Sequence, residues 1–95
     1  MRLNLLPAAR EDLLDLWTFG IGRWGEARAD SYVQDMYAAI ELLAENPEMA
    51  QRADFPDNNV RRLVVGSHVV FYRIDAETID ILRVLHRSRD AGRWL

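Results

Sequence analysis

Residues 60–86, VRRLVVGSHVVFYRIDAETIDILRVLH, decide the fold of this chain. Valine, isoleucine, phenylalanine and tyrosine, which favour strands, dominate three runs within this stretch. The three runs are Val60–Val65, Val69–Ile74 and Thr78–His86. Gly66-Ser67 and Asp75-Ala76-Glu77 lie between them, and linkers this short are typical of β-hairpins. The stretch therefore predicts an antiparallel meander of three strands.

The last run carries apolar residues on both faces of the expected strand, because side chains alternate between faces along a strand. One face should hold Ile79, Ile81, Arg83 and Leu85, and the other Asp80, Leu82, Val84 and His86. This pattern predicts a central strand that is partly covered on each side. It also places Arg83 and His86 on opposite faces.

Two helices are predicted upstream of the meander. The first begins at Pro7, since proline is tolerated at the first helical position, and ends before Gly25. Its apolar stripe consists of Leu13, Leu16, Trp17, Ile21 and Trp24. The second spans Glu26–Glu45 and ends at Asn46-Pro47, because proline cannot continue a helix. Its apolar seam consists of Ala29, Val33, Met36, Ile40 and Leu43. The short connection makes the pair an antiparallel hairpin.

The remaining segments complete an α+β fold. Arg2–Leu6 is predicted to be a short strand, and the polar segment Glu48–Asn59 a connecting loop. Asp90 can cap a final helical turn through Trp94. We therefore expect the N-terminal strand and an antiparallel helical hairpin to pack on a small antiparallel β-sheet, with a short C-terminal helical turn. Residues 1–95 should form a single domain.

Composition narrows the class of protein. The chain has 95 residues, of which 49% are apolar and 28% charged, as in ordinary globular domains. Cysteine is absent, which excludes disulfides, thiol catalysis and cysteine-based zinc sites. No apolar run approaches the roughly 20 residues of a membrane span, and the N-terminus lacks the apolar region of a signal peptide. We expect a cytoplasmic protein without membrane association.

Charge is distributed unevenly along the chain. The net charge is −3, yet residues 60–95 carry seven arginines and four acidic residues. All 12 basic residues are arginine, whose planar guanidinium binds carboxylates and phosphates through paired hydrogen bonds. The basic segment could face nucleic acid or an acidic protein, or it could form ion pairs with the acidic helices.

The candidate chemistry is limited to this basic segment. The two histidines, His68 and His86, are 18 positions apart, so no metal site is expected, and no motif indicates a cofactor. His86 could act as a general acid on a phosphodiester that Arg83 and Arg87 hold. Alternatively, Arg83 pairs with an acidic residue of a helix, and His86 forms hydrogen bonds near the C-terminal turn.

Aromatic residues are concentrated in the helical hairpin. Trp17 and Trp24 lie on the inner stripe and should belong to the core. Phe19, Tyr32 and Tyr37 lie off the seam, where exposed apolar side chains would mark a surface for a partner.

Several short motifs, in this order, resemble ParE toxins of the RelE/ParE toxin superfamily. The motifs are Arg23-Trp24-Gly25, Leu43-Ala44-Glu45-Asn46-Pro47, residues 66–73 (GSHVVFYR), and residues 79–86 (IDILRVLH) followed by Asp90. The resemblance extends over nearly the whole chain. It implies a helical hairpin on an antiparallel sheet, in agreement with the pattern above.

The resemblance further implies the toxin component of a type II toxin–antitoxin module. Its partner would be a ParD-like antitoxin that wraps and neutralises it in a hetero-oligomer, with DNA contacted only through the antitoxin. ParE-type members inhibit DNA gyrase, whereas RelE-type members cut mRNA on the ribosome and carry catalytic residues, often with an aromatic residue near the C-terminus. Here Arg87 follows His86 and the tail offers only Trp94, which favours the ParE branch and no catalytic activity. A ribosome-dependent mRNA endonuclease is the alternative.

Two sets of site residues follow from this interpretation. The antitoxin is expected to contact Arg61, Arg62, Arg73, Arg83, Phe19 and Tyr37. The gyrase target is expected to contact His86, Arg87, Arg89, Arg93 and Trp94. His86, Arg83 and Arg87 would be catalytic only in the endonuclease alternative.

Overall fold

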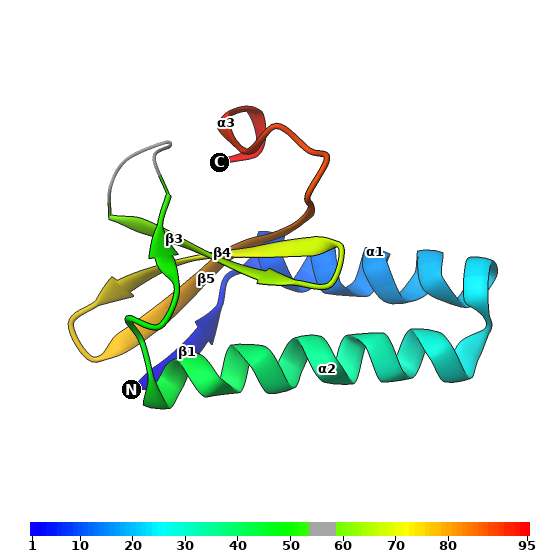
Figure 1. Ribbon diagram of the computed structural model, residues 1–95, viewed down its shortest axis with the longest axis horizontal. Coiled ribbons are helices and arrows are strands. Elements are labelled where there is room, and N and C mark those ends of the chain that lie inside the picture. The colour runs from blue at the N-terminus through cyan, green and yellow to red at the C-terminus, as the bar shows by residue number, and fades with distance from the viewer. Residues whose placement is uncertain (54–58) are drawn as a thin grey trace.

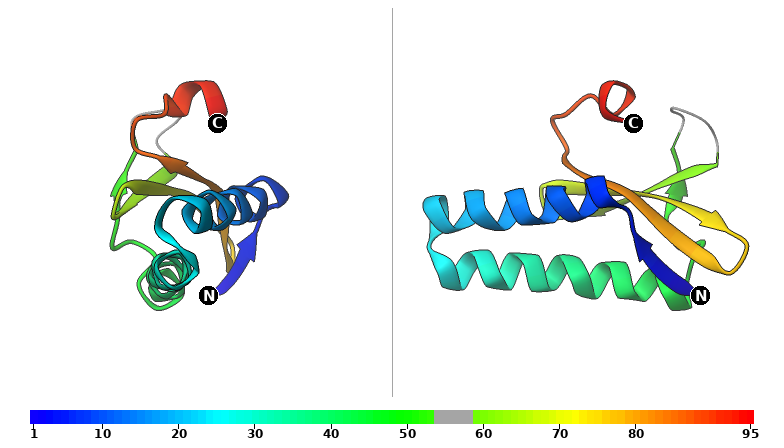
Figure 2. Two further views of the ribbon diagram at one scale, coloured as in Figure 1. Left: turned by 90° about the vertical axis from the view of Figure 1, so that its right-hand side faces the viewer. Right: turned by 180° about the vertical axis from the view of Figure 1, so that it is seen from behind.

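The computed structural model describes residues 1–53 and 59–95 and has the expected α+β architecture. Its elements are β1 (Arg2–Leu5), α1 (Pro7–Trp24), α2 (Glu26–Glu45), β2 (Gln51–Arg52), β3 (Val60–Val65), β4 (His68–Asp75), β5 (Thr78–His86) and α3 (Ala91–Trp94). Figure 1 shows the hairpin of α1 and α2 on one side of the sheet and α3 on the other. The views in Figure 2 agree with this three-layer arrangement.

Both long helices have the predicted bounds because local signals set their ends. Pro7 occupies the first turn of α1, and Gly25 follows its last residue with a φ of 92°, a backbone conformation that favours glycine. The Gly25 N–H donates to the Ile21 carbonyl at 3.0 Å, and the Ala29 N–H donates to the Gly25 carbonyl at 3.1 Å. One residue therefore ends α1 and begins α2, which produces the tight hairpin.

The strands of the sheet are ordered β1-β5-β4-β3-β2. The predicted meander β3-β4-β5 is antiparallel, and β5 lies inside the sheet between β1 and β4, as expected for a strand with apolar residues on both faces. β1, however, pairs with β5 in parallel, with Arg2 opposite Thr78, so the sheet is mixed rather than wholly antiparallel. The parallel direction follows from the connection between the two strands. The helices α1 and α2 return the chain to the end of the sheet where β1 begins, and β3, β4 and β5 then alternate in direction, so β5 runs the same way as β1.

The segment predicted as a loop contains the short strand β2, which pairs with β3 through Gln51 opposite Arg62 and Arg52 opposite Arg61. The prediction of a loop over Glu48–Asn59 is therefore wrong at Gln51–Arg52, and residues 54–58 lie outside the described residues. A strand of two polar residues has no apolar alternation of its own, so pairing with β3 defines it.

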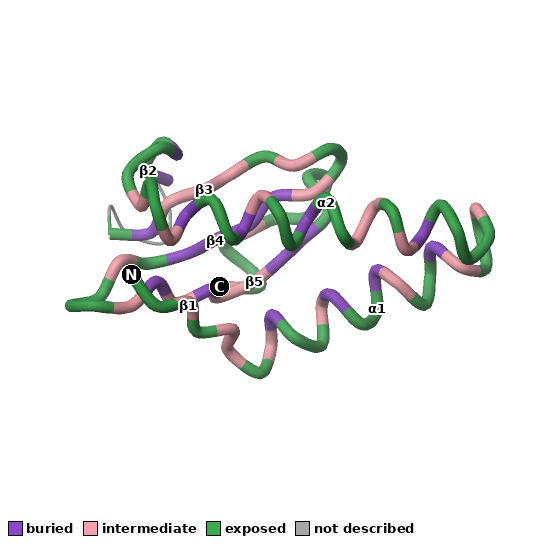
Figure 3. Tube along the Cα trace, turned by 90° about the horizontal axis from the view of Figure 1, so that it is seen from below, coloured by how far each residue is buried: buried purple, intermediate pink, exposed green. Residues whose placement is uncertain are grey.

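The sheet is buried on both faces, but unequally. The larger cluster lies between the sheet and the hairpin and includes Met36, Ile40, Leu43, Val70, Tyr72, Ile79, Ile81 and Val84. The smaller cluster lies on the other face, where Val60, Val69, Phe71 and Leu85 are packed against Ala91 and Leu95 of the C-terminal segment. Figure 3 shows the buried residues recurring along α1, with exposed residues between them.

A β-bulge shifts the register of β5. Tyr72 pairs with Ile81 whereas its neighbour Phe71 pairs with Arg83, so Leu82 is the additional residue. Ile81 and Val84 consequently belong to the same core cluster. The predicted division of β5 into two alternating faces is therefore wrong beyond Leu82, because simple alternation takes no account of a bulge.

Candidate functional site

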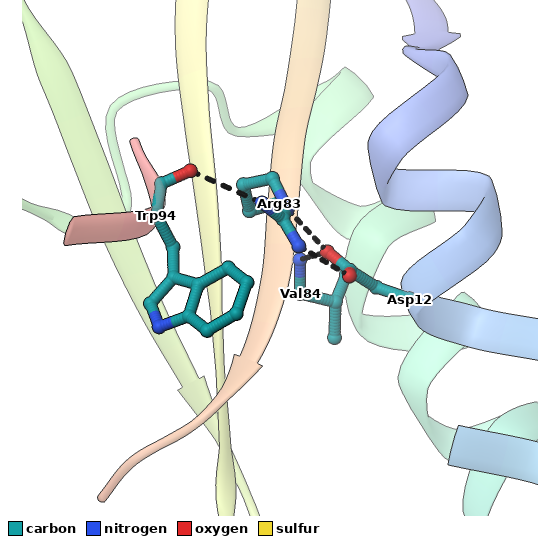
Figure 4. A network of polar contacts seen from close by, with 4 residues as sticks. All are labelled: Asp12, Arg83, Val84 and Trp94. Carbon is teal, nitrogen blue, oxygen red and sulfur yellow. Dashed lines mark hydrogen bonds and ion pairs between the residues drawn. The ribbon is translucent and has the colours of Figure 1, made fainter. Parts of the chain in front are cut away.

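Arg83 forms the strongest ion pair among the described residues (Figure 4). Its Nε donates to Asp12 Oδ2 at 2.8 Å, and its Nη2 donates to Asp12 Oδ1 at 2.7 Å. The backbone N–H of Val84 donates to the same Asp12 Oδ2 at 2.9 Å, and Arg83 Nη1 donates to the Trp94 carbonyl at 3.1 Å. The Arg83 and Asp12 side chains are only 19% and 11% exposed. The hydrogen bonds that Arg83 donates to Asp12 raise the pKa of Arg83 above its ordinary value.

Arg83 is therefore bound within the chain by Asp12, which leaves little of its guanidinium exposed for the antitoxin contact that the sequence predicted. The sequence analysis also allowed an ion pair between Arg83 and an acidic residue of a helix, and the structure has this pair, with Asp12 of α1. Sequence reasoning missed Asp12 as its partner. A signal was present, because Asp12 lies between Ala9 and Leu16 on the buried stripe of α1, where an acidic residue needs a partner.

The other three arginines expected to contact the antitoxin lie in different surroundings. Arg61 is half-buried; its Nη1 donates to the Ala50 carbonyl at 2.8 Å, and its Nη2 lies 4.0 Å from Glu48 Oε1. Arg62 is also half-buried, whereas Arg73 is exposed. Because Arg61 pairs with Tyr72 and Arg62 with Phe71, their side chains leave opposite faces of the sheet. The four arginines therefore do not form one continuous surface.

A pocket of about 250 Å³ lies on the sheet face opposite the helical hairpin. Its lining residues are Ala53, Arg62, Val69, Phe71, His86, Arg87, Arg89 and Ala91. The pocket thus combines one residue expected to contact the antitoxin, Arg62, with three expected to contact the target. Arg83 is not part of the lining.

His86 is exposed at the end of β5 and forms local hydrogen bonds. Its Nδ1 lies 2.7 Å from Ser88 Oγ and accepts from the Ser88 N–H at 3.1 Å. These contacts agree with the second interpretation of the sequence, in which His86 forms hydrogen bonds near the C-terminal turn instead of acting as a general acid. Of the three candidate catalytic residues, Arg83 is bound to Asp12, whereas His86 and Arg87 line the pocket.

Arg93 and Trp94, the two remaining residues expected to contact the target, are exposed on α3. The guanidinium of Arg89 stacks over the indole of Trp94, with its Cζ 4.6 Å from the ring centroid. The C-terminal segment thereby joins the rim of the pocket to α3.

Tyr32 connects α2 to the turn between β3 and β4. Its hydroxyl accepts from the Ser67 N–H at 2.9 Å and lies 2.8 Å from Nδ1 of His68. Gly66 has a φ of 59°, and a Cβ there would come within 2.7 Å of the Tyr32 hydroxyl. Tyr32 is therefore half-buried against the sheet, and its predicted place on an exposed partner surface is wrong.

The environment of His68 predicts a loss of stability at mildly acidic pH. Burial, followed by the nearby His86, lowers the pKa of His68 below its ordinary value of 6.5. As the pH falls below 6.5, the unfolded chain therefore binds a proton that the folded chain binds less readily. We therefore expect the urea concentration at the unfolding midpoint to decrease as the pH is lowered from about 7.5 to about 5.5.

The His68→Gln variant isolates this effect, because glutamine can still accept a hydrogen bond from Tyr32 but does not titrate. The fall in midpoint over the same pH range should be smaller in this variant than in the unsubstituted protein. An equal fall in both proteins would contradict the assignment to His68.

Phe19 on α1 and Tyr37 on α2 are 61% and 39% exposed, as the sequence predicted. Arg23 lies over the Phe19 ring, with its Cζ 5.8 Å from the centroid. Leu14 on α1 and Leu42 on α2 are also exposed, at 58% and 51%. The hairpin thus presents large apolar side chains to solvent, as surfaces that bind partners do.

Within the described residues, no group of three or more histidine, cysteine or acidic side chains could hold a metal ion. Nor does any helix in the described part of the chain have the length and hydropathy needed to span a bilayer.

A family model described as the ParE toxin of type II toxin-antitoxin system, parDE, matches residues 3–91. The chain is 45% identical to Toxin ParE1 of Caulobacter vibrioides over 96 residues, which cover 97% of this chain and 95% of that protein. It is 39% identical to Toxin ParE1 of Mycobacterium tuberculosis strain H37Rv over 95 residues, covering 99% and 97% of the two chains.

Two solved structures share the fold. A chain of a chromosomal ParDE toxin–antitoxin system from P. aeruginosa superposes with a TM-score of 0.80 at 23% identity, covering 90% of this chain and 95% of the other. A chain of the RelBE2 toxin–antitoxin complex from Mycobacterium tuberculosis gives a TM-score of 0.62 at 24% identity, covering 90% and 96%. At these identities the two structures support the fold alone.

Proposed function

The chain belongs to the ParE toxin family of type II toxin–antitoxin systems, and on that premise we propose that it inhibits DNA gyrase and is neutralised by a ParD-like antitoxin that binds it directly. The match of the ParE family model to residues 3–91 carries the proposal. The toxin would act in the cytoplasm, in a hetero-oligomer with its antitoxin, and would contact DNA only through that partner.

The proposed antitoxin surface joins the outer hairpin to the sheet. Phe19 and Tyr37 offer apolar area on the helices, and aromatic side chains are frequent hot spots of interfaces. Arg61 lies on the sheet face toward the hairpin, whereas Arg62 and Arg73 lie on the opposite face, so an antitoxin whose carboxylates contact all three must reach around the β2–β3 edge. Arg83 is left out of this surface because Asp12 already binds it.

The proposed gyrase surface consists of exposed residues in the last ten positions of the chain. Its members are His86, Arg87, Arg89, Arg93 and Trp94. The proposal includes no catalytic step, and the binding of Arg83 by Asp12 argues against the endonuclease alternative, in which Arg83 would have to hold the phosphodiester. A toxin of this kind would act by binding its target rather than by cleaving it.

Purified protein should inhibit supercoiling of relaxed plasmid by DNA gyrase, and addition of the antitoxin encoded beside it should restore supercoiling. The Arg87→Ala variant removes one exposed charge of the proposed gyrase surface. It should inhibit gyrase less than the unsubstituted toxin, at unchanged thermal stability. Supercoiling that persists at a large molar excess of toxin would contradict the gyrase proposal.

Primer extension on mRNA after induced expression tests the alternative in the same cells. Cuts at codon positions that disappear in the His86→Ala variant would replace gyrase inhibition with ribosome-dependent cleavage. Intact mRNA together with inhibited gyrase is the expected result.

A further inference from the structure

Arg62, one of the residues that line the pocket on the face opposite the hairpin, has an unsatisfied nitrogen. Arg62 Nε is buried and has no hydrogen-bond partner, and it is the one such side-chain atom among the described residues. Leaving a buried donor unpaired costs about 1–3 kcal/mol, and more when the group is charged. Because buried polar groups nearly always have partners, this nitrogen indicates a missing acceptor.

The positive charge of the pocket lining indicates that the missing hydrogen-bond acceptor is an anion. Arg62, Arg87 and Arg89 contribute three guanidinium groups, and no acidic residue is among the lining residues that the structure describes. The neighbouring carboxylate, Asp90, accepts from the Gly92 N–H at 3.1 Å and caps α3. Three positive charges around one pocket attract an anion from solution or from a partner.

The apolar part of the lining indicates what kind of molecule the anionic group belongs to. Val69 and Phe71 are buried beside the pocket, and Ala53 and Ala91 complete its apolar wall. A ligand that fills the pocket must therefore place carbon atoms against these side chains. The carboxylate of glutamate or aspartate stands at the end of an apolar stem, so an acidic side chain has both required parts.

A nucleic-acid phosphate suits the pocket less well. A phosphodiester is flanked by a sugar on each side, and both sugars would have to enter with it for an oxygen to reach the guanidinium of Arg62. A side-chain carboxylate enters from one end. The pair between Arg83 and Asp12 is an example in this chain, because Nε and Nη2 together bind both oxygens of one carboxylate.

We propose that this pocket is a subsite for a glutamate or aspartate side chain of the antitoxin, with Arg62 as the central contact. The inference rests on the proposed antitoxin binding and adds the chemistry of one contact to it. Since His86, Arg87 and Arg89 line the same pocket, an acidic side chain bound there covers part of the surface proposed to contact gyrase. The antitoxin would thus neutralise the toxin by occupying its target surface directly.

The test measures the affinity of the full-length antitoxin encoded beside this chain for three toxin variants, by calorimetry at two salt concentrations. Arg62→Gln should weaken binding by about 10- to 100-fold, as expected for loss of hydrogen bonds to a charged group. Arg62→Lys should recover little, because lysine lacks Nε and the planar fork. Arg2→Gln, which removes an exposed arginine on the outer strand β1, is the control and should bind like the unsubstituted toxin.

The antitoxin supplies the second half of the test. Each acidic residue of its C-terminal segment is replaced by the corresponding amide and measured against unsubstituted toxin, which avoids any effect of Arg62 on folding. One replacement should weaken binding strongly, and that replacement should have no further effect on Arg62→Gln, as a double-mutant cycle requires for a direct contact.

The outcomes separate the two proposals. If unsubstituted toxin fails to bind the antitoxin, the proposed function is wrong. If it binds and neither Arg62→Gln nor any amide replacement weakens the complex, the subsite is wrong while the proposed function stands. If instead a short single-stranded RNA binds the free toxin and Arg62→Gln abolishes that binding without affecting the antitoxin, the pocket is a phosphate site and the carboxylate assignment is overturned.

Discussion

The Arg83→Ala variant should lose about 3–5 kcal/mol of unfolding free energy, the range seen when one partner of a buried ion pair is removed. The replacement leaves the Asp12 carboxylate, 11% exposed, with the Val84 N–H as its remaining donor among the described residues. It also removes the donor to the Trp94 carbonyl and the stacking of the guanidinium on the Trp94 ring. The variant therefore disturbs the contact of α1 with β5 and the docking of α3 together.

Thermal and urea denaturation, followed by circular dichroism, measure this loss. For a domain of this size each kcal/mol corresponds to about 4–8 °C in Tm, so the shift should be easily resolved. Asp12→Ala should cost a similar amount, and the double variant should cost clearly less than the sum of the two. Asp15→Ala, an exposed acidic residue of the same helix, is the matched control.

A loss below about 1 kcal/mol for Arg83→Ala would place the pair among ordinary surface salt bridges and contradict this account. Arg83 is also unsuitable as a probe of antitoxin binding, because Asp12 binds it within the fold. Reversal of its charge would disrupt the folded toxin, so reduced binding by such a variant would report on folding rather than on a contact.

The Gly66→Ala variant should lose about 2–3 kcal/mol, from positive-φ strain and from displacement of the Tyr32 hydroxyl. The backbone has a φ of 59° there, and the new Cβ would lie 2.7 Å from that hydroxyl. Tyr32 would have to move, and its hydrogen bonds to Ser67 and His68 would weaken. Urea denaturation at pH 7.5 measures the loss.

Two further variants make this test specific. Gly22→Ala is the control, because a Cβ there meets nothing within 4 Å and alanine is the better helix former, so this variant should be slightly more stable. Tyr32→Phe removes the atom at 2.7 Å, so Gly66→Ala should cost less in that background. Equal costs in the two backgrounds would show that the hydroxyl plays no part and would leave backbone strain as the sole cause.

The ends of the helices were predictable because the signals are local. Pro7, Gly25 and Asn46-Pro47 act within one turn of the residues that they affect, and the structure confirms both helices at the predicted positions. The features that the prediction missed depend on residues far apart in sequence. The two residues of β2 become a strand only by pairing with β3, and the parallel direction of β1 depends on β5.

The site was predictable only in part for the same reason. The sequence identified Arg62, His86, Arg87 and Arg89 as functional candidates but divided them between two surfaces. Their meeting in one pocket depends on the pairing of β3 with β4 and on the return of the C-terminal segment across the sheet. The partner of Arg83 lies 71 positions away, and alternation along β5 could not anticipate the bulge at Leu82.

The pairing of β1 with β5 has a consequence for the order of events during synthesis. Arg2 lies opposite Thr78, so β1 cannot complete its pairing until β5, 76 positions further along the chain, has been made. Contacts between such distant residues form slowly because a long loop must close first. A nascent chain therefore cannot close its sheet on β1 before β5 has left the ribosome.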